Sequence, residues 1–139
     1  DEEIEKEVGM SISKIFEKKG ETYFREIEEK ITFKILKQNN NVISLGGGIF
    51  LNKNINKEIL DNHISFWLNW SPITLIKRIE NSIKRPVAFK ASKNELLELI
   101  NKRSKIYSKA LYKIDCENLT KNEIVNNIIK IYENKKINS

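Results

Sequence analysis

Two short apolar runs limit most strongly what this chain can fold into. The first covers Val42-Ile43-Ser44-Leu45 and ends at three consecutive glycines, and the second covers residues 64–70. Both are typical of buried strands in a parallel sheet that helices cover. Residues 112–115 are a third, shorter candidate strand. Strands that alternate with helices predict an α/β domain with a parallel sheet.

Helix signals surround these runs in the first part of the chain. An acidic segment over residues 2–8 is followed by Gly9, a favourable left-handed C-cap. Apolar residues at helical spacing begin at Ile12, and beyond Gly20 one apolar stripe continues to about Lys37. These patterns predict a short helix and then a longer helical segment that Gly20 punctuates.

The second part of the chain carries clear helix-start signals. Ser71-Pro72 supplies an N-cap and then a proline at the first helical position, and this helix is expected to end near Asn81. Two capping-box patterns predict further helices, over about 92–111 and from residue 120 onward. These pairs are Ser92 with Glu95 and Thr120 with Glu123.

Length and composition bound the organisation of the chain. Its 139 residues form one domain at most, which we assign to residues 1–134 with a mobile loop over 82–91 and a frayed polar tail over 135–139. No run approaches the roughly 18 apolar residues that cross a bilayer, and no signal peptide is evident. The single cysteine, Cys116, excludes an internal disulfide and agrees with a reducing cytosol. We therefore expect a cytoplasmic protein that does not bind membranes.

The basic charge leaves the partner open. A net charge of +6 suits nucleic acid, a membrane surface or a highly anionic small substrate, and equally a solvated basic surface. Only four of the 25 cationic side chains are arginines: Arg25, Arg78, Arg85 and Arg103. Because lysine serves everywhere else, the arginines are candidates for positions that need a planar, bidentate fork. The local sequence alone explains Arg25 equally well as a partner of Glu28 at i,i+3, and Arg103 has no clearer assignment.

The three consecutive glycines are the clearest candidate for a binding site. Gly46, Gly47 and Gly48 follow a predicted strand, at the end where open α/β sheets bind ligands. Their backbone N–H groups can approach an anion or a hydroxyl closely, although a flexible turn without a ligand is the alternative. Asp1 is one of only three aspartates and is a second candidate, but a helix N-cap would also explain it.

Other polar residues give weaker signals. Arg78 and Arg85 flank the predicted loop, where arginines suit stabilisation of negative charge on a transferring phosphoryl group. His63 is assigned to the surface or a strand edge, and Cys116 to a structural role. The sequence shows no metal-ligand cluster and no Ser-His-Asp arrangement, so it predicts no metal site of its own.

Taken together, these residues resemble the shikimate kinases, a family of small phosphotransferases with the nucleoside-monophosphate-kinase-like P-loop fold. The resemblance runs in order along nearly the whole chain. It rests on Asp1 with the acidic helix, Gly9-Met10-Ser11-Ile12, Ile15-Phe16, Gly20-Glu21, Phe24-Arg25, Glu28, Gly46-Gly47-Gly48, Arg85-Pro86 and Arg103 through Tyr107. It implies a three-layer α/β fold. It also implies transfer of the γ-phosphoryl group of ATP to the 3-hydroxyl of shikimate, a step of chorismate and aromatic amino-acid biosynthesis.

The resemblance implies roles for single residues on the substrate side. Asp1 would hydrogen-bond the shikimate hydroxyls and help to activate the one that attacks. Arg25 and Arg103 would clamp the shikimate carboxylate, which suits bidentate guanidinium forks. The backbone of Gly46, Gly47 and Gly48 would contact the ring hydroxyls. The rest of the pocket wall would come from Phe16, Phe24 and Glu28.

On the nucleotide side, the resemblance implies that Arg85 reaches the ATP phosphates and that Arg78 lies near the adenine. The family's phosphate-binding motif, G-x-x-x-x-G-K-[ST], does not occur in the 139 residues. The resemblance places this motif, which also carries the ligand for Mg²⁺, before Asp1. The first strand, first helix and second strand go with it, so the expected fold is N-terminally truncated. With the first strand absent from between 42–45 and 64–70, the 139 residues alone are expected neither to fold stably nor to phosphorylate shikimate.

Two alternatives stay open. A gluconate kinase-like enzyme of the same fold would have less need for Arg25 and Arg103 to converge on a carboxylate. A non-enzymatic basic module that binds nucleic acid would show a lysine-dominated patch and steep salt dependence, but the basic residues are not interleaved with aromatics. We expect a monomeric kinase whose partners are shikimate and ATP rather than nucleic acid.

Overall fold

The computed structural model of the chain describes residues 1–80 and 92–137. It divides into two compact units, Asp1–His63 and Ile64–Ser139, and each is described by itself. The predicted loop over 82–91, with Arg85, lies outside the described residues. No helix in the described ranges is both long and apolar enough to cross a membrane.

Helices dominate the first unit. They are α1 (Glu2–Val8), α2 (Ile12–Leu36), the short 3₁₀ helix η1 (Ile49–Leu51) and α3 (Lys53–Asn62). Gly9 ends α1 with φ 71°, as its C-cap position predicts. Gly20 has φ 83° and ψ 172° and bends α2, so the predicted break in the helical segment is also confirmed. Both positive φ angles favour glycine because a Cβ atom is strained there.

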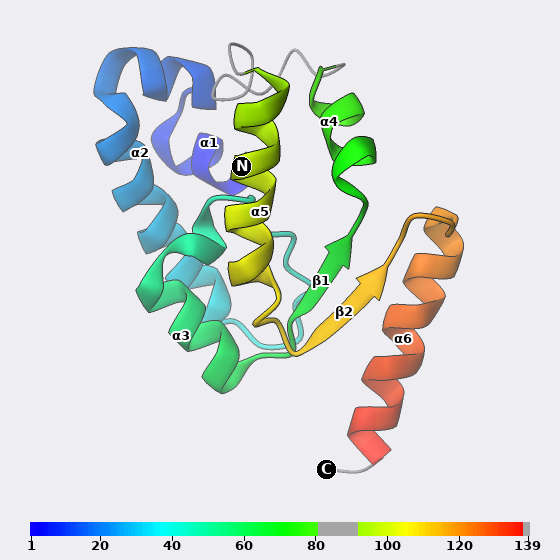
Figure 1. Cartoon of the computed structure of the whole chain (residues 1–139). Helices are drawn as coiled ribbons and strands as arrows, with labels where there is room; N and C mark the ends of the chain where they lie inside the picture. Colours follow the sequence, from blue (N-terminus) through cyan, green and yellow to red (C-terminus); the bar gives the residue numbers. More distant parts are fainter. Residues whose placement is uncertain (81–91, 138–139) are drawn as a thin grey trace. The chain divides into compact units, whose positions relative to one another are not determined.

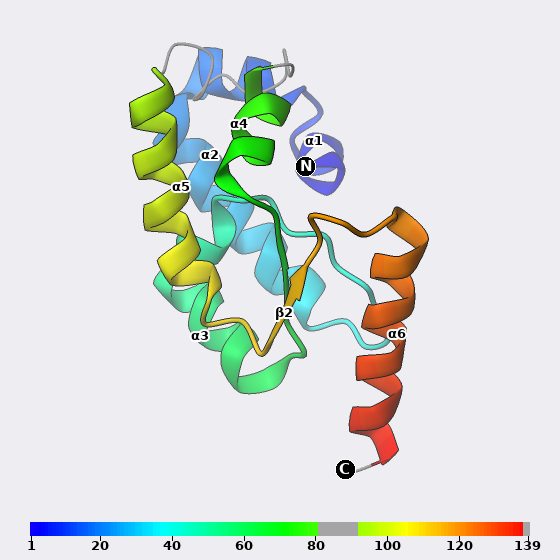
Figure 2. The same ribbon diagram turned by 45° about the vertical axis from the view of Figure 1, so that its right-hand side comes forward.

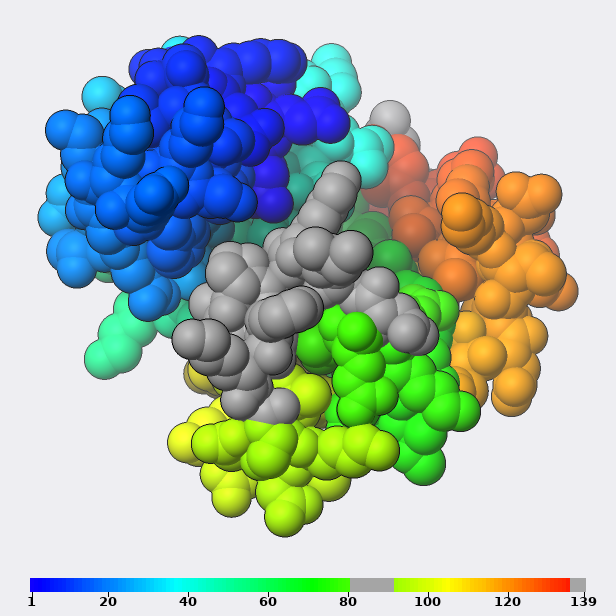
Figure 3. Space-filling model, turned by 90° about the horizontal axis from the view of Figure 1, so that it is seen from above, coloured from blue at the N-terminus to red at the C-terminus, as the bar shows by residue number. Residues whose placement is uncertain are grey.

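One apolar core holds α1 against both halves of α2 (Figure 1). Its fully packed members are Ile4, Ile15, Phe24 and Ile31. The rings of Phe16 and Phe24 pack at a centroid distance of 4.6 Å. Seen in space-filling form, α1 and the first turns of α2 make one continuous blue surface (Figure 3). Burial of these side chains fixes the helix that carries Arg25.

The second unit contains a two-stranded parallel sheet. Strand β1 (Phe66–Asn69) pairs with β2 (Tyr112–Asp115), and Phe66 lies opposite Tyr112. Between them come α4 (Pro72–Glu80) and α5 (Lys93–Tyr107), and α6 (Lys121–Ile137) follows β2. Figure 2 shows α4 beside α5, which share a small core of Ile76, Leu96 and Ile100. A second small core joins the sheet to α6 through Ile114, Cys116 and Ile124.

The predicted helix starts are confirmed. Ser92 and Glu95 form a complete capping box, and Thr120 and Glu123 make the same reciprocal hydrogen bonds. Ser71 Oγ accepts a hydrogen bond from Thr74 N at 3.2 Å, so it caps α4. Helix α5 ends at Tyr107 instead of continuing to about Leu111, because the chain must turn there to bring β2 beside β1.

Residues 42–45 do not form the predicted strand. The structure leaves them without regular secondary structure, and Val42 is fully exposed. A strand needs a hydrogen-bonded neighbour, and the only ladder among the described residues joins β1 to β2. The prediction failed because the apolar pattern records a preference for burial and carries no information about which partner supplies the ladder.

The last helix also differs from the prediction. Helix α6 continues to Ile137, where the sequence predicted a frayed tail from residue 135. Basic residues are favourable near a helix C-terminus, because they complement the negative end of the helix dipole. The division of the chain into a kinase domain and a tail stays a prediction.

Candidate functional site

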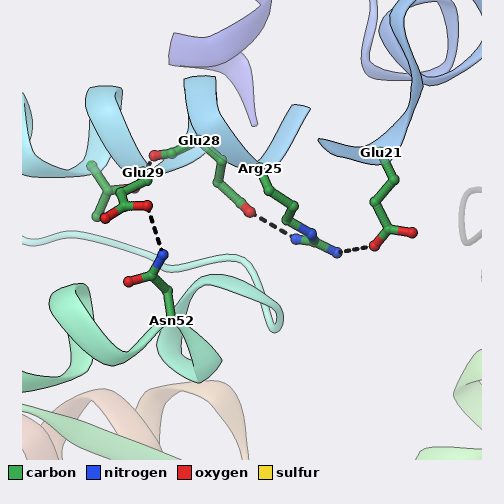
Figure 4. A network of polar contacts seen from close by, with 6 residues as sticks. Glu21, Arg25, Glu28, Glu29 and Asn52 are labelled. Carbon is green, nitrogen blue, oxygen red and sulfur yellow. Dashed lines mark hydrogen bonds and ion pairs between the residues drawn. The ribbon is translucent and has the colours of Figure 1, made fainter. Parts of the chain in front are cut away.

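Arg25 is the centre of a network of charged side chains on α2 (Figure 4). Its Nη1 donates to Glu28 Oε2 at 2.7 Å, and its Nη2 donates to Glu21 Oε1 at 3.3 Å. The side chain of Glu28 is 6% exposed and that of Glu21 is 62% exposed. The guanidinium also lies over the ring of Phe24, with Cζ 5.1 Å from its centroid. The pairing with Glu28 that the sequence spacing indicated is confirmed.

The surroundings keep Arg25 charged. Partial burial lowers its pKa, but hydrogen bonds and charge from Glu28 and then Glu21 outweigh burial, so the pKa lies above its ordinary value. The Arg25 guanidinium already lies beside the carboxylate of Glu28. A further anion would therefore be stabilised only if it contacts the guanidinium directly.

The glycine turn lies against this network. A Cβ atom on Gly48 would overlap Arg25 Nη1 and would lie 3.0 Å from its Cζ. Gly48 has φ −87°, so its backbone would accept any residue, and glycine is needed here for the close approach of the guanidinium. A Cβ atom on Gly46 would lie 3.4 Å from Glu28 Oε1 and 3.8 Å from Asp1 Oδ1. These contacts join the turn to Arg25 and Glu28, and a ligand site at the three glycines stays a prediction.

Glu29 ties the segment after the glycines to α2. Its two carboxylate oxygens accept hydrogen bonds from Asn52 Nδ2 at 2.8 Å and Asn54 Nδ2 at 2.9 Å (Figure 4 shows the first). Asn52 also caps α3 by accepting from the backbone of Asn54 and Ile55. These hydrogen bonds were not predicted from the sequence, although an asparagine immediately before a helical pattern is a recognisable N-cap signal.

Asp1 occupies the N-cap position of α1, but its side chain makes no capping hydrogen bond. Its carboxylate instead lies near Gly46. Other helices do use their N-cap side chains, as Ser11 does for α2. Asp1 is therefore the N-cap residue that the sequence allowed, without a side-chain cap, and its carboxylate lies beside the glycine turn.

In the second unit, Arg78 stacks on Trp70. Its Cζ lies 4.5 Å from the centroid of the indole ring, within the range of a cation–π interaction. Glu117 lies nearby: hydrogen bonds from Thr74 and Ser71, and then the charge of Arg78, lower the pKa of its carboxyl. Glu117 is far from the other residues of this group in the sequence, so spacing gave no signal for its part in it.

Arg103 has an unusual environment. Its Nε is buried and has no hydrogen-bond partner. Buried donors are almost always paired, and an unpaired one costs about 1–3 kcal/mol. The Nε of Arg103 on α5 is therefore a donor that no described residue satisfies.

The first unit thus brings Asp1, Arg25, Gly46 and Gly48 together, with Gly47 between the two glycines. Arg78 and Arg103 lie in the second unit, and Arg85 lies outside the described residues. Among the described residues no group of three or more His, Cys, Asp or Glu side chains could hold a metal ion. Arrangements of this kind can hold an anionic ligand and one or more hydroxyl groups.

Comparison with known proteins assigns these features to a family. The family model described as shikimate kinase matches residues 1–133. The chain belongs to the shikimate kinase family. A shikimate kinase of Thermodesulfovibrio yellowstonii is 39% identical over 134 residues, which cover 96% of this chain and 78% of the relative. The crystal structure of shikimate kinase from Aquifex aeolicus matches with a TM-score of 0.82 and 32% identity, over 97% of this chain and 80% of that one.

A further solved structure supports the fold. Shikimate kinase from Acinetobacter baumannii, in complex with shikimate, matches with a TM-score of 0.87 over 98% of this chain and 77% of that one, at 24% identity. The α/β kinase fold expected from the sequence is therefore confirmed for this family member. Membership in this family favours the shikimate kinase prediction over the gluconate kinase-like and nucleic-acid-binding alternatives.

Proposed function

We propose that the chain carries the shikimate-binding part of an enzyme that transfers the γ-phosphoryl group of ATP to the 3-hydroxyl of shikimate. The observation that carries the proposal is the contact of the Arg25 guanidinium with the backbone of Gly48, beside Asp1. It places a bidentate cation, backbone groups and a carboxylate at one turn. Family membership supports the same activity.

On the substrate side, Arg25 and Arg103 bind the carboxylate of shikimate. Arg25 is permanently charged, and Arg103 has a buried donor without a partner. The backbone of Gly46, Gly47 and Gly48 contacts the ring hydroxyls, which need a surface without side chains. Asp1 accepts a hydrogen bond from the attacking hydroxyl and assists removal of its proton. Positioning of this kind supplies most of what phosphoryl transfer requires from a protein.

On the nucleotide side, Arg78 lies near the adenine, and Arg85 stabilises charge on the phosphates. The stack of Arg78 on Trp70 supports a fixed position for the first of them. Mg²⁺ is expected to accompany ATP, but the described residues do not fit a metal site, so no step is assigned to Mg²⁺ here. A monomeric state and a cytoplasmic location, with no nucleic-acid or membrane partner, belong to the same proposal.

The test compares two proteins. One is the 139-residue chain, and the other is a fused protein in which a segment with the motif G-x-x-x-x-G-K-[ST], which the family resemblance places before Asp1, is joined to Asp1. Shikimate and ATP binding are measured by calorimetry, and phosphorylation by a coupled assay. We expect the fused protein to phosphorylate shikimate and the 139-residue chain to show neither cooperative unfolding nor turnover.

A variant of the fused protein makes the test specific. Arg25→Lys should lose shikimate binding and keep ATP binding, because lysine cannot form the bidentate contact. Phosphorylation of gluconate in place of shikimate, or equal shikimate affinity in the variant, would contradict the proposal. Turnover by the 139-residue chain would contradict only the expectation for that chain.

A further inference from the structure

The two carboxylates on Arg25 differ in kind. Glu28 is buried and binds Nη1 at 2.7 Å, which is typical of a strong, charge-assisted hydrogen bond. Glu21 is exposed, lies one helical turn before Arg25 and binds Nη2 at 3.3 Å. Figure 4 shows them on either side of the guanidinium. The hydrogen bond to Glu28 is therefore strong and buried, and the one to Glu21 is weak and exposed to solvent.

We propose that Glu21 is an internal competitor for the ligand carboxylate that Arg25 binds. It occupies Nη2 while no ligand is bound and must release it when the ligand arrives. Glu21 acts through Arg25 and is a positioning residue that lowers the affinity for a carboxylate substrate. The inference rests on the proposed function, because it concerns the same Arg25 subsite.

Geometry decides which carboxylate gives way. The guanidinium has five N–H groups, of which Glu28 uses one on Nη1 and Glu21 uses one on Nη2. A ligand carboxylate whose bidentate contact includes Nη2 therefore meets Glu21 there. Displacing Glu28 would strand a buried charge, which is costly. Displacing Glu21 only returns an exposed carboxylate to water, and exposed ion pairs contribute little.

The guanidinium does not depend on Glu21 for its position. It is held by Glu28, by the ring of Phe24 beneath it and by the backbone of Gly48 beside it. Once a ligand carboxylate is bound, Glu21 would be a like charge near it and would weaken binding further. Removal of the negative charge at Glu21 should therefore strengthen carboxylate binding without disordering Arg25.

The experiment uses Glu21→Gln, which keeps the size of the side chain and removes its charge. Glu26→Gln is the matched control, since Glu26 is an exposed glutamate on the same helix that forms no ion pair with Arg25 in the structure. Each variant is made in the 139-residue chain and in the fused protein, so that a fold dependent on the added segment still gives a result. The ligands are shikimate and its uncharged methyl ester, titrated by calorimetry.

We expect Glu21→Gln to tighten shikimate binding about two- to fivefold, the range that loss of an exposed ion pair gives. Methyl ester binding should stay unchanged, and Glu26→Gln should change neither. In the fused protein the KM for shikimate should fall while the KM for ATP stays the same. Equal shikimate binding in the two variants, or weaker binding in Glu21→Gln, would overturn the competitor role alone. Absence of shikimate binding in the fused parent protein would instead overturn the proposed function, and this inference with it.

Discussion

Arg25 and Arg103, which family resemblance assigns to the same carboxylate, lie in opposite environments. In the first unit, Arg25 donates hydrogen bonds to two glutamates and lies against a glycine. In the second unit, Arg103 has a buried Nε with no acceptor. One arginine is stabilised before any ligand arrives, and the other bears an electrostatic cost until an acceptor reaches it.

Under the proposed function, the two arginines would bind one ligand group by different routes. Arg25 is preorganised, so its contribution is set by what the ligand must displace. Arg103 gains more from the ligand because a buried donor becomes satisfied. The two arginines should therefore contribute to folding with opposite signs although both contribute to binding.

The largest expected effect comes from replacing each arginine by methionine, which has a similar length and no charge. Arg25→Met strands the Glu28 carboxylate and should lower the free energy of unfolding by about 1–3 kcal/mol, less than for a fully buried pair because Arg25 is partly exposed. Arg103→Met removes an unpaired donor and should leave stability unchanged or raise it by about 1 kcal/mol. Urea unfolding of the ligand-free fused protein measures both.

The shikimate affinity of the two variants is the second part of this prediction. Both variants should bind shikimate at least tenfold more weakly, since each loses a charge-assisted contact worth about 1.5–3 kcal/mol. A destabilised Arg103→Met protein would show that Arg103 has a structural partner in solution, and the contrast between the arginines would be broken.

The glycine turn should give the next largest effect. In Gly48→Ala the new Cβ atom would displace the Arg25 guanidinium, so we expect roughly tenfold weaker shikimate binding. Stability should change by less than about 1 kcal/mol, because the backbone angles suit alanine and the displaced group is the end of a flexible side chain. Calorimetry with shikimate and urea unfolding measure the two effects.

Gly46→Ala is the matched control for that prediction. Its Cβ atom would meet Glu28 and Asp1 only near ordinary van der Waals distances, so shikimate affinity should fall less than in Gly48→Ala. Equal losses in the two variants would mean that the turn is sensitive to any side chain, and that the contact with Arg25 is not special.

The sequence predicted these regions unequally. Local chemistry identified the pair of Arg25 with Glu28, the bend at Gly20 and the capping boxes at Ser92 and Thr120, because each depends on neighbours within four residues. The glycine turn was predicted from three consecutive glycines after an expected strand, and that strand does not form. Family resemblance then supplied the assignment of Asp1 to a ligand, whereas the position alone favoured a helix cap.

What the sequence could not predict depends on partners far along the chain. Residues 42–45 are apolar enough for a strand, but strand formation requires a neighbour that the pattern does not name. The stack of Arg78 on Trp70 joins a helix to the end of a strand, and no period links the two positions. The unpaired Nε of Arg103 is a property of packing, which the sequence around an arginine does not reveal.

A smaller effect is expected at Trp70, on which the guanidinium of Arg78 stacks in the second unit. Trp70→Leu removes the aromatic face and should weaken ATP binding of the fused protein about two- to fivefold, the range of a partly exposed cation–π contact. Trp70→Phe should restore part of the loss. Trp67→Leu removes the indole of Trp67 in β1 and should leave ATP affinity unchanged; a loss equal to that of Trp70→Leu would point to damage to β1.

The smallest expected effect is a pH dependence of the helix starts that differs between the two units. Hydrogen bonds from Ser92 lower the pKa of Glu95, and those from Thr120 lower the pKa of Glu123, so each lies below its ordinary value near 4.5. A lowered carboxyl pKa stabilises the folded state above the ordinary value, and that contribution disappears as the pH falls through the folded value. The starts of α5 and α6 should therefore lose protection between about pH 5 and pH 3.

The start of α2 provides the internal control, because its cap is Ser11 and the residue three places later is Lys14 rather than a glutamate. Hydrogen exchange with mass spectrometry across this pH range, corrected for the intrinsic exchange rate, should show lost protection at Ser92 and Thr120 and none at Lys14. Glu95→Gln keeps a neutral acceptor and should make the start of α5 less sensitive to pH. Loss of protection at all three helix starts together would indicate global acid unfolding, and the capping carboxylates would then not distinguish the second unit from the first.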